Sequence, residues 1–296
     1  MSPFFSVIIP TYNKSKELKI AIVSVLLQSF CDFEILVMDD GSTDDTQQVI
    51  LAINDTRILY EWEKNYGGPA RPRNRGIVKA KGEWICFLDH DDAWLPDKLE
   101  VCYQHINESV DLIYHNLKII GRPTSFFKNN IIKSRQLSTP VIIDLLINDN
   151  PISNSSVVVR KKILDKIGLI NEDLEMMASE DYNTWLRIAF ITENFLYIPI
   201  VLGLYSVNDS NMSSRDMSGP VEYARKDYLH LISDYQNNKY MYKVKYATGR
   251  RSFIEGKNIK AIDNLKYAFI NGDIGIKLKS LYMLIVIKFI KSHSVS

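Results

Sequence analysis

The sequence predicts an α/β protein with a mostly parallel, doubly wound sheet, followed by a C-terminal helical extension. Strand-like and helix-like segments alternate with short connections over the first 116 residues, which is typical of strand–helix–strand units. Polar clusters follow three of the expected strands, at the sheet edge where ligands bind in this fold class. After Gly219 and Pro220 the remaining segments have helical patterns.

Seven short apolar segments have the length and composition of strands. They are residues 4–10, 34–38, 58–62, 84–88, 110–114, 157–159 and 195–205. The run 84–88 has no polar residue, as expected of a strand that is covered on both faces. The sequence therefore predicts a sheet whose central strands are buried by helices on both sides.

Helical patterns separate these strands. They cover residues 18–28, 69–81, 97–107, 161–167 and 180–190, and four more lie near 221–236, 240–255, 258–271 and 274–291. Another helix is expected to start at Ser42 or Thr43, because both residue types cap helices. Residues 118–138 have no regular period and are predicted to form a loop. We expect one domain over residues 1–218, with halves over about 1–116 and 117–218, and a basic helical region over 219–296.

The overall charge argues against a general nucleic-acid-binding protein, because the net charge is only +1. The charge is unevenly distributed, however. Residues 221–296 contain fourteen Lys and Arg against six Asp and Glu. A basic tail on an acidic body predicts an anionic partner surface for the tail.

The cysteines and the N-terminus indicate a cytoplasmic protein. Cys31, Cys86 and Cys102 are odd in number and lack CxxC spacing, which favours reduced buried thiols. The N-terminus lacks signal-peptide features, and no apolar stretch reaches the length of a transmembrane helix. Lysines flank the longest stretch, residues 281–290. Two interpretations stay open for this helix: docking on the inner face of the plasma membrane, near anionic lipids, or packing on the body.

Three acids follow the buried run directly. Asp89, Asp91 and Asp92 come immediately after residues 84–88, and like charges held together in a partly desolvated place repel each other. A divalent cation with a nucleotide diphosphate would relieve the repulsion, because such cations prefer carboxylate oxygens and bridge to phosphates. The Asp-x-Asp spacing alone also occurs in phosphatases and in acidic surface turns. Its position after a buried strand favours a metal site.

Three further groups of charged residues are candidates for a site. Asp40 follows the strand 34–38, and its carboxylate could accept the imide N–H of uracil or cap a helix. Arg73 lies with two other arginines near a helix start, where positive charge is unfavourable unless an anion binds. Glu180 and Asp181 open another helix. The sequence leaves open whether these acids serve the helix dipole or act as a base.

Five ordered segments resemble one known family. They are Ser-Val-Ile-Ile-Pro-Thr-Tyr-Asn at 6–13, Val-Met-Asp-Asp-Gly-Ser-Thr-Asp at 37–44, Gly-Gly at 67–68 with Arg-Asn-Arg-Gly-Ile at 73–77, Phe-Leu-Asp-His-Asp-Asp at 87–92, and Ser-Glu-Asp-Tyr at 179–182 with Trp-Leu-Arg at 185–187. Together they are similar to the family 2 glycosyltransferases of the GT-A fold, a Rossmann-like architecture. These are inverting enzymes that use nucleotide-diphospho-sugars. The resemblance spans about residues 4–206 and implies a nucleotide-binding half over about 1–116 and an acceptor half over about 117–218.

The resemblance implies a role for each matching residue. The residues implied to contact the donor nucleotide are Pro10, Thr11, Tyr12, Asn13, Asp40, Arg73, Asp89 and His90. Asp91, with Asp89, is implied to hold Mn²⁺ or Mg²⁺, and Asp181 to be the general base with Glu180 in support. Many relatives continue after the last strand with Tyr-Arg-x-His, where this chain has Tyr-Ser-Val-Asn at 205–208. An expected arginine and histidine are therefore absent, and Asn208 is the remaining polar candidate there.

The function that the resemblance implies is metal-dependent inverting hexosyl transfer. The donor would be UDP-hexose or UDP-N-acetylhexosamine, and the acceptor a glycan hydroxyl, with an undecaprenyl-diphosphate-linked oligosaccharide of O-antigen, capsule or exopolysaccharide synthesis as a candidate. Two alternatives stay open. A non-catalytic nucleotide-sugar or glycan-binding protein would not need a base such as Asp181. A sugar nucleotidyltransferase would need a Gly-rich basic loop after the first strand, which residues 11–14 do not provide.

Overall fold

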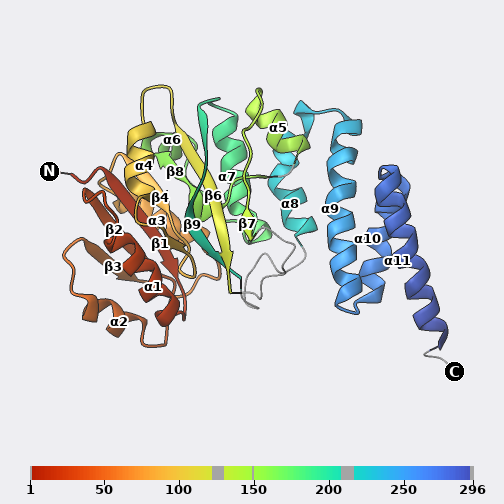
Figure 1. Cartoon of the computed structure of the whole chain (residues 1–296), viewed down its shortest axis with the longest axis horizontal. Helices are drawn as coiled ribbons and strands as arrows, with labels where there is room; N and C mark the ends of the chain where they lie inside the picture. The colour runs from red at the N-terminus through yellow and green to blue at the C-terminus, as the bar shows by residue number, and fades with distance from the viewer. Residues whose placement is uncertain (1, 122–129, 149, 208–216, 294–296) are drawn as a thin grey trace.

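One sheet and three C-terminal helices dominate the architecture in Figure 1. The computed structural model describes residues 2–121, 130–148, 150–207 and 217–293. The order of the strands across the sheet is β3-β2-β1-β4-β8-β6-β9-β5, with β7 paired to β6. Because β1 lies between β2 and β4, the chain reverses its direction of travel across the sheet there, which is where doubly wound sheets bind ligands.

The N-terminal half of the sheet is parallel. Its strands are β1 (Phe5–Thr11), β2 (Phe33–Asp39), β3 (Ile58–Trp62) and β4 (Trp84–Phe87), and all three ladders among them are parallel. Every residue of β1 and β4 is buried, which agrees with the prediction of a strand covered on both faces. The connecting helices are α1 (Ser15–Leu26), α2 (Thr46–Ile53), α3 (Ala70–Lys79) and α4 (Lys98–His105).

The second half of the sheet mixes strand directions. Its strands are β5 (Ala93–Trp94), β6 (Leu112–Ile120), β7 (Ile131–Ile132), β8 (Val158–Arg160) and β9 (Phe195–Ser206). The long β6–β9 ladder is parallel, whereas the antiparallel ladders are only two or three residue pairs long. The expectation of a mostly parallel sheet is therefore confirmed.

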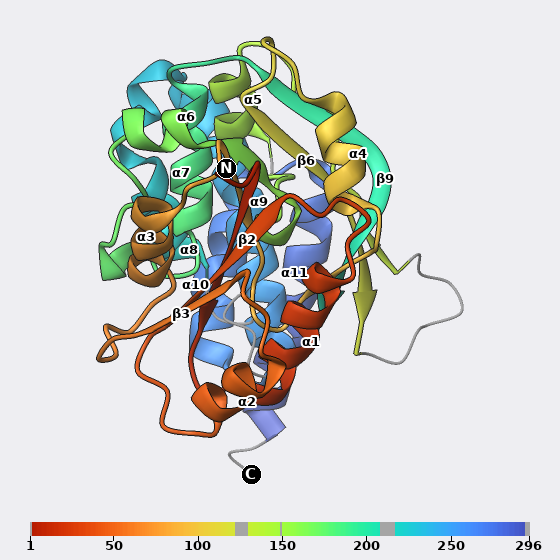
Figure 2. The same cartoon turned by 90° about the vertical axis from the view of Figure 1, so that its left-hand side faces the viewer.

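Helices cover both faces of the sheet, as Figure 2 shows. One apolar cluster includes buried residues of α1 and α4, and the other lies beneath α3, α5 (Val141–Ile147) and α7 (Glu180–Ala189). Three short helices complete this part: η1 (Asn154–Ser156), α6 (Lys161–Lys166) and η2 (Leu174–Met176). Cys86 and Cys102 belong to the first cluster. Cys31 is exposed, so the prediction of buried thiols is wrong for that residue.

Two predicted boundaries are wrong near β2 and β6. Helix α2 begins at Thr46 and not at Ser42 or Thr43. Ser42 does not cap the helix, because its hydrogen bonds connect two loops: its backbone N–H donates to Asp39 Oδ1 over 2.7 Å, and its Oγ accepts the N–H of Asn13. Strand β6 continues to Ile120 and pairs with β7 inside the predicted loop. A strand of two residues carries no recognisable period, which explains why β7 was not predicted.

The C-terminal region is helical, as predicted, but its breaks differ. It contains α8 (Ser218–Arg225), η4 (Lys226–Leu231), α9 (Asp234–Ile254), α10 (Asn258–Asn271) and α11 (Ile274–His293). Helix α9 starts at residue 234 because Ser233 and Gln236 form a capping box, which satisfies free N–H groups at the helix start. Within the described residues, no helix combines the length and apolarity needed to cross a bilayer.

A buried arginine attaches this region to the sheet domain. The Arg225 side chain is fully buried and donates to the Leu146 carbonyl over 2.5 Å and to Asn237 Oδ1 over 3.1 Å. Asn183, on α7, donates to the Ala224 carbonyl over 2.9 Å. Helices α8 and α9 are thus anchored on the body. Helices α10 and α11 form a separate small apolar core with α9 and lie at the far end of the molecule in Figure 1.

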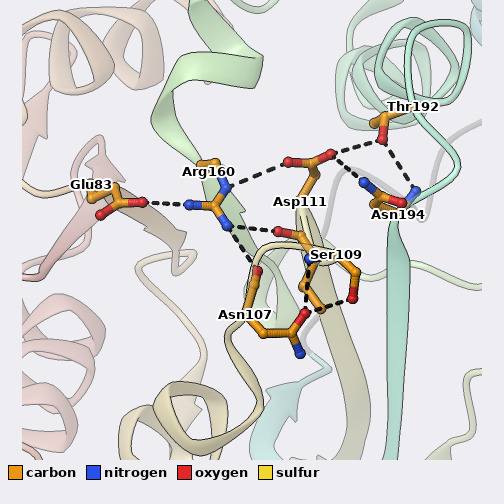
Figure 3. Close-up of polar contacts among 8 residues, drawn as sticks. Glu83, Asn107, Ser109, Asp111, Arg160, Thr192 and Asn194 are labelled. Atoms are coloured by element: carbon orange, nitrogen blue, oxygen red, sulfur yellow. Dashed lines mark hydrogen bonds and ion pairs between the residues drawn. The ribbon is translucent and has the colours of Figure 1, made fainter.

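A polar network holds the amino ends of three strands together (Figure 3). Arg160 pairs with Glu83 and with Asp111, and Asp111 Oδ2 accepts from Thr192 Oγ1 and Asn194 Nδ2. Glu83, Asp111 and Asn194 immediately precede β4, β6 and β9. This network therefore fixes the edge of the sheet opposite to the carboxyl ends and leaves those ends available for a site.

Candidate active site

A cleft of about 600 Å³ lies at the carboxyl ends of β1 and β4. That volume is typical of pockets that hold a small-molecule ligand. Among the residues that the structure describes, every predicted site residue except Asn13 lines it: Pro10, Thr11, Tyr12, Asp40, Arg73, Asp89, His90, Asp91, Glu180 and Asp181. The structure therefore brings together residues that are up to 171 positions apart in the sequence.

Asn13 lies next to the cleft and organises two loops. Its backbone is left-handed, with φ of 50°, a conformation that Asn tolerates better than most residues. Its Oδ1 accepts the backbone N–H groups of Thr43 and Asp44 over 2.7 and 3.3 Å. The side chain thus joins the loops that follow β1 and β2, and its predicted contact with the donor stays a prediction.

The adjacent acids Asp39 and Asp40 have different surroundings. Asp39 is fully buried and accepts from Ser42 N–H and, over 2.8 Å, from the Tyr60 hydroxyl. Asp40 lines the cleft and accepts the backbone N–H groups of Tyr66 and Gly67 over 3.1 and 3.2 Å. Each carboxylate oxygen has a second lone pair, so Asp40 can also accept from a ligand in the cleft.

Arg73 links the acids of the cleft to one another. The residue is 4% exposed, and its side chain donates from one nitrogen to Asp89 Oδ1 and from another to Glu180 Oε1, each over 2.7 Å. Burial alone would lower the pKa of Arg73, but the two carboxylates outweigh that effect and raise it. Arg73 therefore stays charged and joins α3, the end of β4 and the start of α7. These partners make it a support for the two acids.

The three acids after β4 divide into two kinds. Asp92 is 2% exposed and accepts from Ser155 Oγ over 2.6 Å and Ser206 N–H over 2.9 Å. Burial, and then the neighbouring Asp89 and Asp91, raise the pKa of Asp92. Its two hydrogen bonds give Asp92 a structural role, because they connect the segment after β4 to Ser155 and to the end of β9. Asp89 and Asp91 line the cleft, and Asp89 Oδ1 also accepts from Asn154 Nδ2 over 2.9 Å.

Asp181, at the start of α7, is an acid of the cleft whose pKa is shifted upward. Its Oδ1 accepts the N–H of Tyr182 over 2.6 Å. Burial and then the Glu180 carboxylate raise the pKa of Asp181 to about 7, well above the usual value of about 4 for such a group. A carboxyl group with a pKa near the working pH can both take up and release a proton efficiently.

The donor atoms in the cleft fit a divalent cation that binds together with a phosphate ligand. Among the described residues, no three His, Cys, Asp or Glu side chains gather as a complete metal site. Asp89 and Asp91 supply hard carboxylate oxygens in the wall of the cleft. Mg²⁺ and similar ions are commonly held by one or two carboxylates, with substrate phosphates and water as the other ligands. Asn208, the remaining candidate from the sequence, lies outside the described residues.

Several residues of the cleft were not predicted as site residues. They are Lys14, Asn65, Gly67, Gly68, Pro69, Pro72, Ile132, Ile152, Ser153, Asn154, Ala178 and Tyr205. Lys14 directly follows the Thr-Tyr-Asn segment, so its position in the sequence was a usable signal. Ile132 and Ile152 come from segments without a regular period. Their position in the cleft depends on contacts between distant segments and could not be predicted from the sequence.

A family model and curated relatives match this chain. The model of "Glycosyl transferase family 2" matches residues 6–168. The chain is 30% identical over 184 residues to the UDP-Glc:alpha-D-GlcNAc-diphosphoundecaprenol beta-1,3-glucosyltransferase WfgD of Escherichia coli, covering 62% of this chain and 68% of that one. It is 42% identical over 120 residues to the GalNAc(5)-diNAcBac-PP-undecaprenol beta-1,3-glucosyltransferase of Campylobacter jejuni, covering 40% of this chain and 39% of that enzyme.

Solved structures share the fold over nearly the whole chain. S. aureus TarS 1–349 in complex with UDP-GlcNAc has a TM-score of 0.62 at 22% identity, covering 93% of this chain and 83% of that one. The mannosyltransferase PcManGT from Pyrobaculum calidifontis, in complex with GDP-Man and Mn²⁺, has a TM-score of 0.63 at 16% identity, covering 94% and 78%. At these identities the likeness shows the fold alone, and it confirms the predicted GT-A architecture with its helical extension.

Proposed function

The chain belongs to glycosyl transferase family 2, and we propose that it is a metal-dependent inverting hexosyltransferase acting on a UDP-sugar and a lipid-linked glycan. The observation that carries this proposal is the shared cleft. Asp40, Asp89 and Asp91 line it together with Asp181, whose pKa suits a base. A protein that only bound nucleotide-sugars or glycans would have no use for a base in that position.

Asp40 and Tyr12 form the proposed nucleoside end of the cleft. Asp40 can accept the imide N–H of uracil, a group that cytosine lacks. Tyr12 lines the cleft and is 47% exposed, so its ring is accessible to a nucleobase. The name of the E. coli relative also specifies a UDP-linked donor. We therefore assign the donor as a UDP-hexose or UDP-N-acetylhexosamine.

Asp181 would carry the proton transfer. Its ionised carboxylate takes the proton from the acceptor hydroxyl while the hydroxyl oxygen attacks the anomeric carbon of the donor. The bond between that carbon and the diphosphate oxygen breaks, and UDP leaves with the bonding electrons. One in-line displacement inverts the anomeric carbon, so an α-linked donor gives a β-glycoside. Arg73 would keep Glu180 and Asp89 in place through its two hydrogen bonds.

Asp91, with Asp89 in support, would hold the divalent cation. When bound, Mn²⁺ or Mg²⁺ would neutralise charge on the diphosphate. Lys14 also lines the cleft and would add positive charge near the donor. This matters because this chain lacks the arginine and histidine that many relatives carry after β9.

The proposed acceptor is a glycan on a lipid diphosphate. The names of both curated relatives specify undecaprenol-linked acceptors, and a hydroxyl of such a glycan is the chemistry that Asp181 would serve. A lipid-linked acceptor also places the reaction at a membrane surface. We therefore propose that the protein works peripherally on the inner face of the plasma membrane, in surface-polysaccharide synthesis.

The released nucleotide product tests the reaction class. We expect the protein with Mn²⁺, an extract of lipid-linked glycans and a panel of UDP-sugars to release UDP with one or a few donors. A nucleotidyltransferase would form pyrophosphate or consume it, and a binding protein would release neither product. The same panel identifies the donor sugar, and proton NMR of the product should show an inverted anomeric centre.

The pH dependence of the rate follows from the pKa of Asp181. Because only the ionised carboxylate accepts a proton, kcat/KM should rise about tenfold per pH unit below pH 7 and level off above it. Glu180→Gln removes one of the charges that raise this pKa, so its profile should shift to lower pH. Rates measured from pH 5 to 9 check both expectations. A wild-type profile without a bend near pH 7 would argue against Asp181 as the base.

A further inference from the structure

The outer face of α11 carries an apolar stripe that is exposed to solvent. Ile274, Leu278, Leu281, Tyr282 and Ile285 are between 39% and 80% exposed. At 3.6 residues per turn these five positions fall within about 100° around the helix axis. The opposite face carries Met283 and Ile287, which are buried in the small core with α10. Helix α11 therefore has two apolar faces, and only one of them is used in folding.

The stripe continues into an apolar groove between α9 and α11. The groove has a volume of about 520 Å³. Leu278 and Tyr282 line it from α11, and Phe253 and Ile254 from α9. Ile254 is itself 70% exposed. The exposed apolar surface is thus contiguous over two helices. Contiguous apolar surfaces of this kind mark sites that bind a protein, a ligand or a membrane, whereas isolated exposed apolar residues do not.

Positive charge borders this surface. Residues 274–296 contain four lysines and neither Asp nor Glu. By helical position Lys277 and Lys288 lie on one side of the stripe and Lys279 on the other. Arg250 and Lys279 also line the groove. An apolar helical face with lysines along both sides is the pattern of a helix that lies in the interface of an anionic bilayer.

We propose that the exposed stripe of α11 and the α9–α11 groove dock the protein on an anionic lipid surface. This inference rests on the proposed function, because a lipid-linked acceptor is located at a membrane surface and the enzyme has to bind it there. A second copy of the chain is the poorer partner. A two-fold symmetric contact would bring the same lysine-bordered face onto itself and place like charges together.

The docking surface is firmly connected to the helix that carries the base. Helix α9 lies between α11 and the body, and Arg225 ties α8 to both α5 and α9. Asn183 and Asp181 are on the same helix, α7, and Asn183 bonds to Ala224 at the end of α8. Docking through α11 would therefore set the position of the cleft above the membrane, where a lipid-linked glycan could reach it.

Vesicle flotation of the full chain tests the docking surface. We expect binding to vesicles of phosphatidylcholine with phosphatidylglycerol, weakening with added salt, and little binding to phosphatidylcholine alone. The triple variant Leu278→Ser, Tyr282→Ser, Ile285→Ser should bind at least about tenfold less. The matched control changes Ile20, Leu27 and Leu51 to Ser, three exposed apolar residues on α1, directly after α1 and on its neighbour α2, and should float like the wild type.

A charge variant and a nucleotide assay complete the test. Lys277→Glu, Lys279→Glu, Lys288→Glu should abolish the preference for anionic vesicles. The proposal is overturned if the wild type does not float with anionic vesicles at low salt, or if the α11 serine variant floats as well as the control. It is also overturned if the serine substitutions change only the oligomeric state. Mn²⁺-dependent UDP binding by the same samples tests the donor site separately, so the two proposals can fail independently.

Discussion

Asp181→Asn should lower kcat by roughly 10²–10⁴-fold, the usual contribution of a general base, while UDP binding with Mn²⁺ stays unchanged. Asparagine has nearly the same shape as aspartate, and its Oδ1 can still accept the Tyr182 N–H that Asp181 accepts now. What the amide cannot do is take the proton of the acceptor hydroxyl. Initial rates of UDP release and calorimetric titration with UDP measure the two quantities.

The stability of this variant gives an independent check. The pKa of Asp181 is about 7 in the folded protein and about 4 in an unfolded chain, so the folded state binds the proton more tightly. Ionised Asp181 therefore costs stability progressively from pH 4 to pH 7, and the full cost remains above that range. Asparagine carries no charge, so the thermal midpoint of Asp181→Asn at pH 8 should equal or exceed that of the wild type.

Together these measurements separate catalysis from structure. A fall in turnover with an undiminished thermal midpoint assigns Asp181 to the reaction. Glu180→Gln is the comparison variant. Glu180 accepts a hydrogen bond from Arg73, so we expect its substitution to affect the rate by changing the position and the pKa of Asp181. Near-normal turnover of Asp181→Asn, or a greater loss in Glu180→Gln, would transfer the role of base to Glu180 or to another group.

The parts of the fold with long periodic segments were predictable from the sequence. Each of β1, β2 and β4 is a buried run that ends in polar residues, and parallel strands bring their carboxyl ends to one edge. The gathering of Asp40, Asp89 and Tyr12 follows from that geometry alone. The structure confirms the predicted sheet. It also confirms the helical extension, because α8 begins at Ser218, next to the predicted start at Gly219 and Pro220.

The remaining features depend on contacts between distant segments. Strand β8 lies between β4 and β6, and nothing in its three residues specifies that place. Arg73 lines the cleft, where its predicted contact with the diphosphate stays a prediction. Its bonds to Asp89 and Glu180 were not predictable from its position near a helix start. Glu180 is 107 residues away in the sequence. The raised pKa of Asp181 has the same origin, because burial and the charge of Glu180 act only in the folded chain.

Asp91→Ala should remove the metal-dependent part of nucleotide binding. Asp91 lines the cleft, whereas both carboxylate oxygens of Asp92 accept hydrogen bonds within the protein, from Ser155 and Ser206. If Asp91 is the carboxylate that holds the cation, the variant should bind UDP equally weakly with Mn²⁺ and with EDTA. Calorimetric titrations under the two conditions measure the difference directly.

The electrostatics of the cluster make this loss interpretable. Burial is the main cause of the raised pKa of Asp92, and the negative charges of Asp89 and Asp91 add to it. Removing Asp91 relieves its part of this effect. The thermal midpoint of Asp91→Ala without metal should therefore be measured beside the titrations, so that unfolding can be separated from lost binding. Asp97→Ala is a matched control, because Asp97 is an exposed acid only six residues further along, and its side chain makes no cap hydrogen bond at the start of α4. Equal Mn²⁺-dependent UDP affinity in Asp91→Ala and Asp97→Ala would place the cation elsewhere in the cleft.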